Sequence, residues 1–495
     1  MGGTVDPNVD SNVDPNLDAN VDTDLPVAQN QAAGVDTGAP VPVAMEYVEA
    51  QLMELWRDVA EAAQASGGAH TVTTAQVLNL IVHAESYQQA NSFLPPIDRI
   101  TALHPCRVIV AITDPAEGEM PVQAWVSIHC QVPPSGGRQA CSEQVSVAAG
   151  GASARQLPAA IIPLLISSLP VFLWWPLGDP FDDYIFRNLA DSLNRLIVDS
   201  STFENPEGTM AKIANQARGQ WPKIMISDMN WGRITTWREM VAGFFDSPAQ
   251  RPYLDEIAGV TIKYAITPGS REGRHGPVNR SQALLVAGWF ASRLGWEFAE
   301  NVYQLIHTEA SPVPKAHLTM RARKHPISID IEPVMADAAV PGDIIGITLE
   351  APGDEPGKPN ATFAVTLNDT RDACVVAVSV IGLEPTSLTS HLQPIDTGDL
   401  LNQELEMYSH DTVYEDALAV VGRIIRGARH TTRSTEISHR APSGEPISAA
   451  QGQRQSSKGP AAAPAPGQAQ AASPDAERRE DGGPARIDSG TRRGL

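Results

Sequence analysis

The sequence has few cysteines, no basic residue near its N-terminus and no aromatic residue at either end. Its 495 residues include four cysteines, too few for a disulfide scaffold and typical of a cytoplasmic protein. No Lys or Arg precedes Arg57, and 36 basic against 58 acidic side chains give a formal net charge of −22. This excess of acid argues against nucleic acid and anionic membranes as partners, because both attract basic surfaces.

Long apolar runs are also missing. The stretch from Leu157 to Leu177 contains no charged residue, but four prolines interrupt it, and prolines break a continuous spanning helix. The N-terminus lacks the basic and apolar regions of a secretory signal. We therefore expect a cytoplasmic protein that does not enter a membrane.

The distribution of aromatic residues marks the folded part of the chain. Every Phe, Trp and Tyr lies between Tyr47 and Tyr414. Within residues 1–43, the segment VDPNVDSNVDPNLDANVDTD repeats Val/Leu-Asp every four positions without the glycine and glutamate of a calcium-binding EF-hand loop. We therefore predict that residues 1–43 form a disordered acidic arm. Residues 433–495, rich in Ala, Pro, Gly, Gln and Ser, are predicted to be a disordered tail.

Between these ends, the periodicity of apolar residues predicts an α/β protein. Over residues 44–300, extended runs such as Val108–Ile112 alternate with helical patterns, which indicates an α/β sheet domain with parallel strands. Adjacent Trp174 and Trp175 are predicted to face opposite sides of this sheet. Over residues 301–432, strand runs separated by short turns and followed by helices indicate a mostly antiparallel α+β region.

Two local patterns predict helix limits within the first region. Apolar residues at Ile185, Leu189, Leu193 and Leu196 predict one helix that continues into a strand. Thr236 and Glu239 have the spacing of a capping box and predict the start of a second helix.

Signatures of catalysis are absent from the sequence. It contains no glycine-rich dinucleotide motif, Walker A loop, nucleophile elbow or H-E-x-x-H motif, so we assign no catalytic residue, cofactor or metal. His and Cys residues that could approach one another include no C-x-x-C pair, which disfavours zinc. Cys130 and Cys141 could meet across a predicted hairpin as a redox pair, or remain two free thiols.

Polar residues at strand ends are the stronger candidates for a site. Asp199, Ser200 and Ser201 end one predicted strand, and ligands of open α/β sheets bind beyond the carboxyl ends of strands. A second group, at the end of another strand, combines acids with Trp and Arg, the composition of a binding hot spot. Its members are Asp228, Asn230, Trp231, Arg233, Trp237 and Arg238. In the alternative reading, Trp237 belongs to the core and Asp228 caps a turn.

One local cluster of basic residues stands out. Arg271, Arg274 and Arg280 lie in and beside a glycine-rich loop that opens a helix. Such a loop can hold an anion through backbone N–H groups and the helix dipole, or it can be a solvated loop.

Three stretches carry a resemblance to a known family. They are LPVFLWWPLGDPF, LADSLNRLIVDSSTF and ISDMNWGRITTWREMVAGFFDSPAQRPYLDEIAGVTIKY. The pattern S-D-x-N-W-x-R-x-T-x-W-R-E, here Ser227 to Glu239, resembles the most distinctive block of the glucose-6-phosphate dehydrogenase assembly protein family, OpcA. The resemblance extends over residues 45 to 430.

The resemblance implies a non-catalytic partner of glucose-6-phosphate dehydrogenase, the NADP-dependent entry step of the oxidative pentose phosphate pathway. It implies that the partner favours the active oligomer of the enzyme and, in photosynthetic members, responds to thioredoxin. The chain lacks the R-I-D-H-Y-L-G-K-E signature of the dehydrogenase itself. We therefore predict an activating partner that makes no NADPH alone. A sugar-phosphate-binding sensor, or a cryptic α/β enzyme that uses the strand-end groups, is the alternative.

Overall fold

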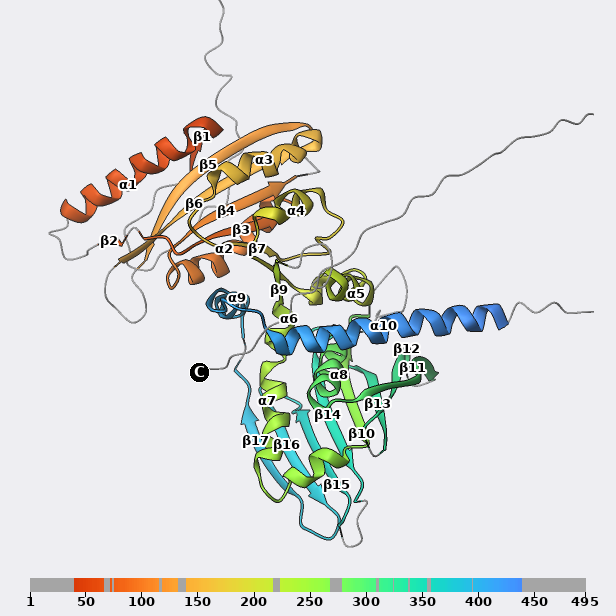
Figure 1. Cartoon of the computed structure of the whole chain (residues 1–495). Helices are drawn as coiled ribbons and strands as arrows, with labels where there is room; N and C mark the ends of the chain where they lie inside the picture. Colours follow the sequence, from red (N-terminus) through yellow and green to blue (C-terminus); the bar gives the residue numbers. More distant parts are fainter. Residues whose placement is uncertain are drawn as a thin grey trace, which may run out of the picture. The chain divides into compact units, whose positions relative to one another are not determined.

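Two mixed β-sheets with surrounding helices make up the part of the chain that the computed structural model describes (Figure 1). All described residues belong to one unit, Met1–Arg440. The described residues are 40–65, 72–73, 75–114, 118–131, 139–216, 223–267, 278–308, 311–323, 325–336, 339–353, 358–393 and 395–438. Most of the predicted arm and most of the predicted tail lie outside these ranges. The last residues of the predicted arm, Val41–Val43, form a strand, and residues 433–438 of the predicted tail continue a helix.

The first sheet has nine strands in the order β1-β5-β6-β4-β3-β7-β8-β9, with β2 paired to β6. Its strands are β1 (Val41–Val43), β2 (Val72–Thr73), β3 (Leu78–Ala84), β4 (Cys106–Thr113), β5 (Met120–Gln131), β6 (Gln139–Gly150), β7 (Val171–Trp175), β8 (Arg195–Val198) and β9 (Met225–Asp228). From β6 to β9 all neighbouring strands are parallel. These six strands have the 3-2-1-4-5-6 order of a doubly wound fold.

Ten α-helices accompany the two sheets in the described part of the chain. They are α1 (Val48–Ala65), α2 (Tyr87–Thr101), α3 (Leu157–Ile161), α4 (Tyr184–Leu189), α5 (Pro206–Gln216), α6 (Met229–Arg233), α7 (Thr235–Gly243), α8 (Ser281–Leu294), α9 (Thr397–Glu406) and α10 (Thr412–Ser438). Trp174 packs in the core formed with α2 and α9, and Trp175 packs in the core formed with α1 and α3. The two indoles therefore lie on opposite faces of the first sheet, as the sequence predicts.

The second sheet has eight strands in the order β11-β12-β13-β10-β14-β15-β16-β17. Its strands are β10 (Gly259–Ile266), β11 (Glu297–Thr308), β12 (Ser311–Arg321), β13 (Pro326–Met335), β14 (Ile344–Ala351), β15 (Ala361–Leu367), β16 (Ala373–Val380) and β17 (Thr386–His391). β10 and β13 run parallel, and the other neighbouring pairs are antiparallel. The α/β fold class is confirmed. The domain boundary at residue 300 stays a prediction; β10 and α8 precede it, and β10 pairs with β13 and β14.

Two predicted helix limits are wrong. Helix α4 ends at Leu189, before the last two residues of the predicted stripe, whereas the strand predicted to follow is found as β8, in which Leu196 pairs with Leu173 and Ile226. Pairing of β8 with strands on both of its sides outweighs the helical spacing of these apolar residues. Thr236 lies inside α7, which begins one residue earlier without a side-chain cap because α6 leads almost directly into it.

Within the described residues, no helix is long and apolar enough to cross a membrane.

Candidate functional site

The carboxyl ends of β8 and β9 bring two of the predicted strand-end groups together. Both Nη atoms of Arg233 donate to the carboxylate of Asp199, each at 2.7 Å. Ser201 donates its N–H and its hydroxyl to the same Asp199. The Arg233–Asp199 pair has the bidentate geometry that makes arginine–carboxylate pairs strong.

Asp228 is buried at the end of β9. Its Oδ1 accepts hydrogen bonds from the backbone N–H groups of Ser200 and Asn230, each at 2.9 Å. Burial raises the pKa of this carboxyl to about 7. Asp228 therefore caps α6 and links the ends of two neighbouring strands.

A chain of amide groups continues from Asn230 to the second sheet. Asn230 Nδ2 donates to Ser200 Oγ at 3.1 Å. Gln282, in the first turn of α8, donates to Asn230 Oδ1 at 2.9 Å and to Asp343 Oδ1 at 2.8 Å. Its own Oε1 accepts from the N–H of Ile344 at 3.0 Å. The predicted strand-end groups are thus brought together, and they bond largely to one another.

The Trp/Arg block is mostly internal. Trp231 is buried and donates from Nε1 to Asp411, just before α10, at 2.9 Å. The guanidinium of Arg238 lies 3.5 Å from the centre of the Trp231 ring. Trp237 is also buried. These contacts fix α6, α7 and the start of α10 together, and a partner-binding role for the block stays a prediction.

The predicted basic cluster is only partly described. Arg271 and Arg274 lie outside the described residues. Arg280 is buried and donates to Tyr303 Oη at 2.8 Å and to Glu207 at 3.0 Å. This geometry explains Arg280 as a link between α5 and β11, and its anion-binding role remains untested.

The topological switch point of the first sheet, between β3 and β7, is occupied by two rings. His83 and Trp175 stack with ring centroids 3.7 Å apart and planes 4° apart. Burial lowers the pKa of His83 to about 3, so its imidazole is neutral near pH 7. The turn that follows β3 contains Glu85 and Ser86, and Ser86 caps α2 by accepting from Gln89 N–H at 3.2 Å. The turn therefore lacks the glycines that let a backbone approach a pyrophosphate.

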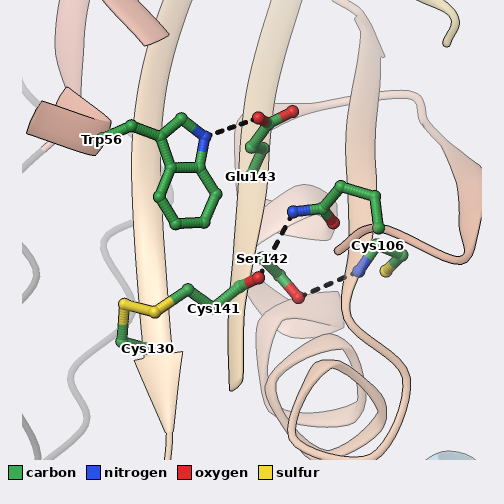
Figure 2. The surroundings of a disulfide bond; sticks show 7 residues. Trp56, Cys106, Cys130, Cys141, Ser142 and Glu143 are labelled. Carbon is green, nitrogen blue, oxygen red and sulfur yellow. Dashed lines mark hydrogen bonds between the residues drawn. A yellow bond between two sulfur atoms is a disulfide. The ribbon is translucent and has the colours of Figure 1, made fainter. Parts of the chain in front are cut away.

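Cys130 and Cys141 form a disulfide bond across the β5–β6 hairpin (Figure 2). Leu55, Trp56 and Val59 of α1 pack against this part of the hairpin. Trp56 Nε1 donates to Glu143 at 2.7 Å (Figure 2). The disulfide is thus built into the surface on which α1 docks.

The other two cysteines are free and buried. Burial raises the pKa of Cys106 to about 12 and that of Cys374 to about 11. Both thiols are protonated near pH 7 and poorly reactive. Among the residues that the structure describes, no three His, Cys, Asp or Glu side chains are grouped as metal ligands.

A cavity of about 520 Å³ lies beside the strand-end groups. Arg233 and Trp237 line one side of it, and Asp343, Arg371 and Gln393 line another. No sequence pattern singles out these last three residues, because they lie in separate connecting segments around β14–β17 and form no motif.

Two family models match the chain. One describes the N-terminal domain of a glucose-6-phosphate dehydrogenase subunit and matches residues 97–215; the other describes its C-terminal domain and matches residues 224–418. The chain belongs to the OpcA family. The resemblance carried by Ser227–Glu239 and its flanking stretches is confirmed, and membership connects the chain to glucose-6-phosphate dehydrogenase.

Relatives of the OpcA family support the same grouping. The chain is 28% identical over 341 residues to a protein of Nostoc punctiforme named for the OxPP cycle and OpcA, covering 68% of this chain and 69% of that protein. A protein of the same name from Synechococcus elongatus is 28% identical over 336 residues, covering 67% of this chain and 70% of that protein. Among solved structures, apo levoglucosan dehydrogenase matches 73% of this chain and 97% of its own with 11% identity and a TM-score of 0.41. That likeness is too low to bear on function.

Proposed function

We propose that the protein is a cytoplasmic, non-catalytic partner of glucose-6-phosphate dehydrogenase. In this proposal it binds the enzyme and favours its active oligomer or conformation, and so raises NADPH production by allosteric activation. Such an effect requires that it bind the active state more tightly than the inactive one. Membership of the OpcA family is the observation that carries this proposal.

The rings at the switch point support a non-catalytic role. The His83–Trp175 stack lies at the carboxyl ends of β3 and β7, beside the position at which doubly wound folds bind a cofactor. Asp199 and Asp228, at the next strand ends, are engaged by Arg233 and by backbone N–H groups. These contacts favour a partner protein over the alternative, a sugar-phosphate sensor or cryptic enzyme that uses the strand-end groups.

The hairpin of β16 and β17 offers the surface that we propose for the dehydrogenase. β17 is an edge strand of the second sheet (Figure 1), and its residues Thr386–His391 include no Lys, Arg, Asp or Glu. Edge strands usually carry charges that prevent pairing with other chains. Ile381, Leu383 and Leu388 of this hairpin are largely exposed. An uncharged edge with exposed apolar side chains is suited to pairing with a strand of a partner.

We also propose that the Cys130–Cys141 disulfide makes activation sensitive to thiol reductants such as thioredoxin. The support is its position beneath α1, where Trp56 bonds to Glu143 two residues from Cys141. Loss of the bond would loosen the hairpin to which α1 is attached.

The main test is a titration of the purified protein into glucose-6-phosphate dehydrogenase from the same source. Initial rates would be followed by NADPH absorbance over a range of glucose 6-phosphate, with the disulfide oxidised and reduced. We expect a saturable fall in the apparent substrate constant or a saturable rise in turnover. A tenfold change in substrate affinity corresponds to about 1.4 kcal/mol of coupling. Unchanged rates under both redox conditions contradict the proposal.

The proposed surface is tested in the same assay with S387K and L388K. Each places a charge on the β17 edge, so we expect at least a tenfold loss of apparent affinity for the dehydrogenase. Y47K is the matched control, because Tyr47 is 60% exposed against 68% for Leu388 but lies beside the first sheet. Equal activation by L388K and Y47K would place the interface elsewhere.

A further inference from the structure

The cavity of about 520 Å³ has a size typical of sites for small ligands. Its wall on the side of the helices includes Arg233, Trp237 and Gln282. Its wall on the side of the second sheet includes Asp343, Arg371 and Asp372. Apolar side chains make up much of the rest of the lining: Val340, Ile344, Ile345, Leu367, Leu392 and Ile395.

Arg371 is held in the cavity wall by a rigid turn. Its φ of 62° lies in the left-handed region that residues other than glycine rarely adopt. Asn368 fixes the turn by donating from Nδ2 to Thr370 at 2.8 Å and to Asp372 at 2.7 Å, and by accepting from Arg371 N–H at 3.1 Å. An unfavourable backbone conformation maintained in this way is common at functional sites.

The guanidinium of Arg371 has unused hydrogen-bonding capacity. Its Nη1 is buried and has no hydrogen-bond partner among the described residues. The other arginine of the cavity, Arg233, is already paired with Asp199. A buried guanidinium N–H without a partner is costly, and a carboxylate or phosphate oxygen is its best acceptor.

Two other lining residues of the cavity suit hydroxyl groups and an apolar ring face. Asp343 uses Oδ1 to accept from Gln282, and a carboxylate can accept several hydrogen bonds. Trp237 contributes an indole to the lining. Acceptors beside an aromatic surface are typical of sites with a few placed polar groups in a mostly apolar lining.

We propose that this cavity binds a monosaccharide-sized anion, a sugar phosphate or a sugar acid, with its anionic group on Arg371 and its hydroxyl groups towards Asp343. The proposal rests on the cavity and not on the proposed partnership with the dehydrogenase. It also differs from a site made of the strand-end groups, since Arg371 and Asp343 belong to the second sheet and its connections.

Isothermal titration calorimetry on the full chain, without the dehydrogenase, tests the proposal. The probes are glucose 6-phosphate, gluconate, glucose and inorganic phosphate. We expect saturable binding of glucose 6-phosphate or gluconate, at least tenfold tighter than binding of glucose or phosphate alone. No saturable binding of any probe at millimolar concentration, or equal binding of phosphate and glucose 6-phosphate, would overturn it.

Variants locate the binding site. R371Q is expected to weaken binding at least tenfold, and R371K less, because lysine keeps the charge without the planar fork. R57Q is the matched control, since Arg57 is an exposed arginine on α1. V340W tests the same site while leaving Arg371 unchanged, so an effect of Arg371 on folding does not complicate it. Val340 is 63% exposed at the cavity, and a bulky ring there should block entry of the ligand. Full binding by both R371Q and V340W would refute the site.

Discussion

The imidazole of His83 lies flat on the indole of Trp175, with ring centroids 3.7 Å apart. The two residues belong to β3 and β7, the neighbouring parallel strands at which the strand order of the sheet reverses. In dinucleotide-binding proteins of this topology, a crevice opens at this point. Here the stacked rings are part of the core, and the neutral state of His83 removes the cost of a buried charge.

The stacking contact should be measurable as stability. We expect H83A to lower the free energy of unfolding by about 2–4 kcal/mol, because it leaves a cavity against Trp175. H83F keeps a ring of similar shape and should lose less than about 1.5 kcal/mol. Urea unfolding followed by tryptophan fluorescence checks both values. Equal losses in the two variants would instead assign the effect to the polar contact between His83 Nε2 and Thr113, at 3.4 Å.

Asp228 should make stability depend on pH. Burial raises the pKa of its carboxyl to about 7 in the folded state from an ordinary value of 3.8, so the folded state retains the proton between these values. Stability contributed in this way is present at low pH and is lost as pH rises towards 7, by roughly 2–4 kcal/mol. D228N, which resembles the protonated acid, should flatten this dependence between about pH 4 and pH 7.

Unfolding free energies measured at several pH values compare the wild type with D228N. D58N is the control, because Asp58 is exposed on α1. A difference between wild type and D228N that is constant with pH would show that Asp228 does not titrate in this range.

Arg238 tests whether the Trp/Arg block contacts a partner. Its guanidinium covers the Trp231 ring and donates to Thr235 Oγ1 at 2.8 Å. Loss of a partly exposed cation–π contact should lower the free energy of unfolding by only about 1 kcal/mol in R238A. If the block is a partner surface, R238A should also reduce activation of the dehydrogenase severalfold. A folded R238A that activates fully would leave the block with a structural role alone.

The disulfide should contribute to the docking of α1. Closing a loop of 11 residues stabilises a fold by about 2–3 kcal/mol. We expect C130S to lose about this amount and to expose α1 to limited proteolysis. Dithiothreitol should have the same effect on the wild type and none on C130S. Equal protection of α1 from proteolysis in the oxidised and reduced wild type would show that the disulfide does not contribute to the docking of α1.

Arg371 should show opposite effects on stability and binding. R371G removes a side chain from a left-handed backbone position, so stability should be unchanged or rise by up to about 1 kcal/mol. Binding of the sugar anion should be lost in the same variant. Thermal unfolding and calorimetry of R371G measure the two effects. A clearly destabilised R371G would mean that Arg371 supports the fold rather than a ligand.

Local periodicity was sufficient to predict much of the fold. The alternation of strands with helices in the first half and of strands with turns in the second predicts the two kinds of sheet that the structure contains. Adjacent Trp174 and Trp175 had to face opposite sides because side chains alternate along a strand. The run Ser227–Glu239 was enough to indicate the OpcA family, because its order of Trp and Arg residues is distinctive.

Contacts between distant segments were beyond the reach of the sequence. Leu196 fits a helical stripe but lies in a strand, because pairing with Leu173 and Ile226 outweighs its local spacing. Likewise, Trp231 belongs to a block with the composition of a binding hot spot, but it is buried. Its N–H donates to Asp411, which lies 180 residues away in the sequence. Arg371 and Asp343 form one cavity with Trp237 only because the chain brings the connections of the second sheet to α7. Sequence patterns indicate on which side of a helix or strand a residue lies, whereas the tertiary structure determines which residues pack against that side.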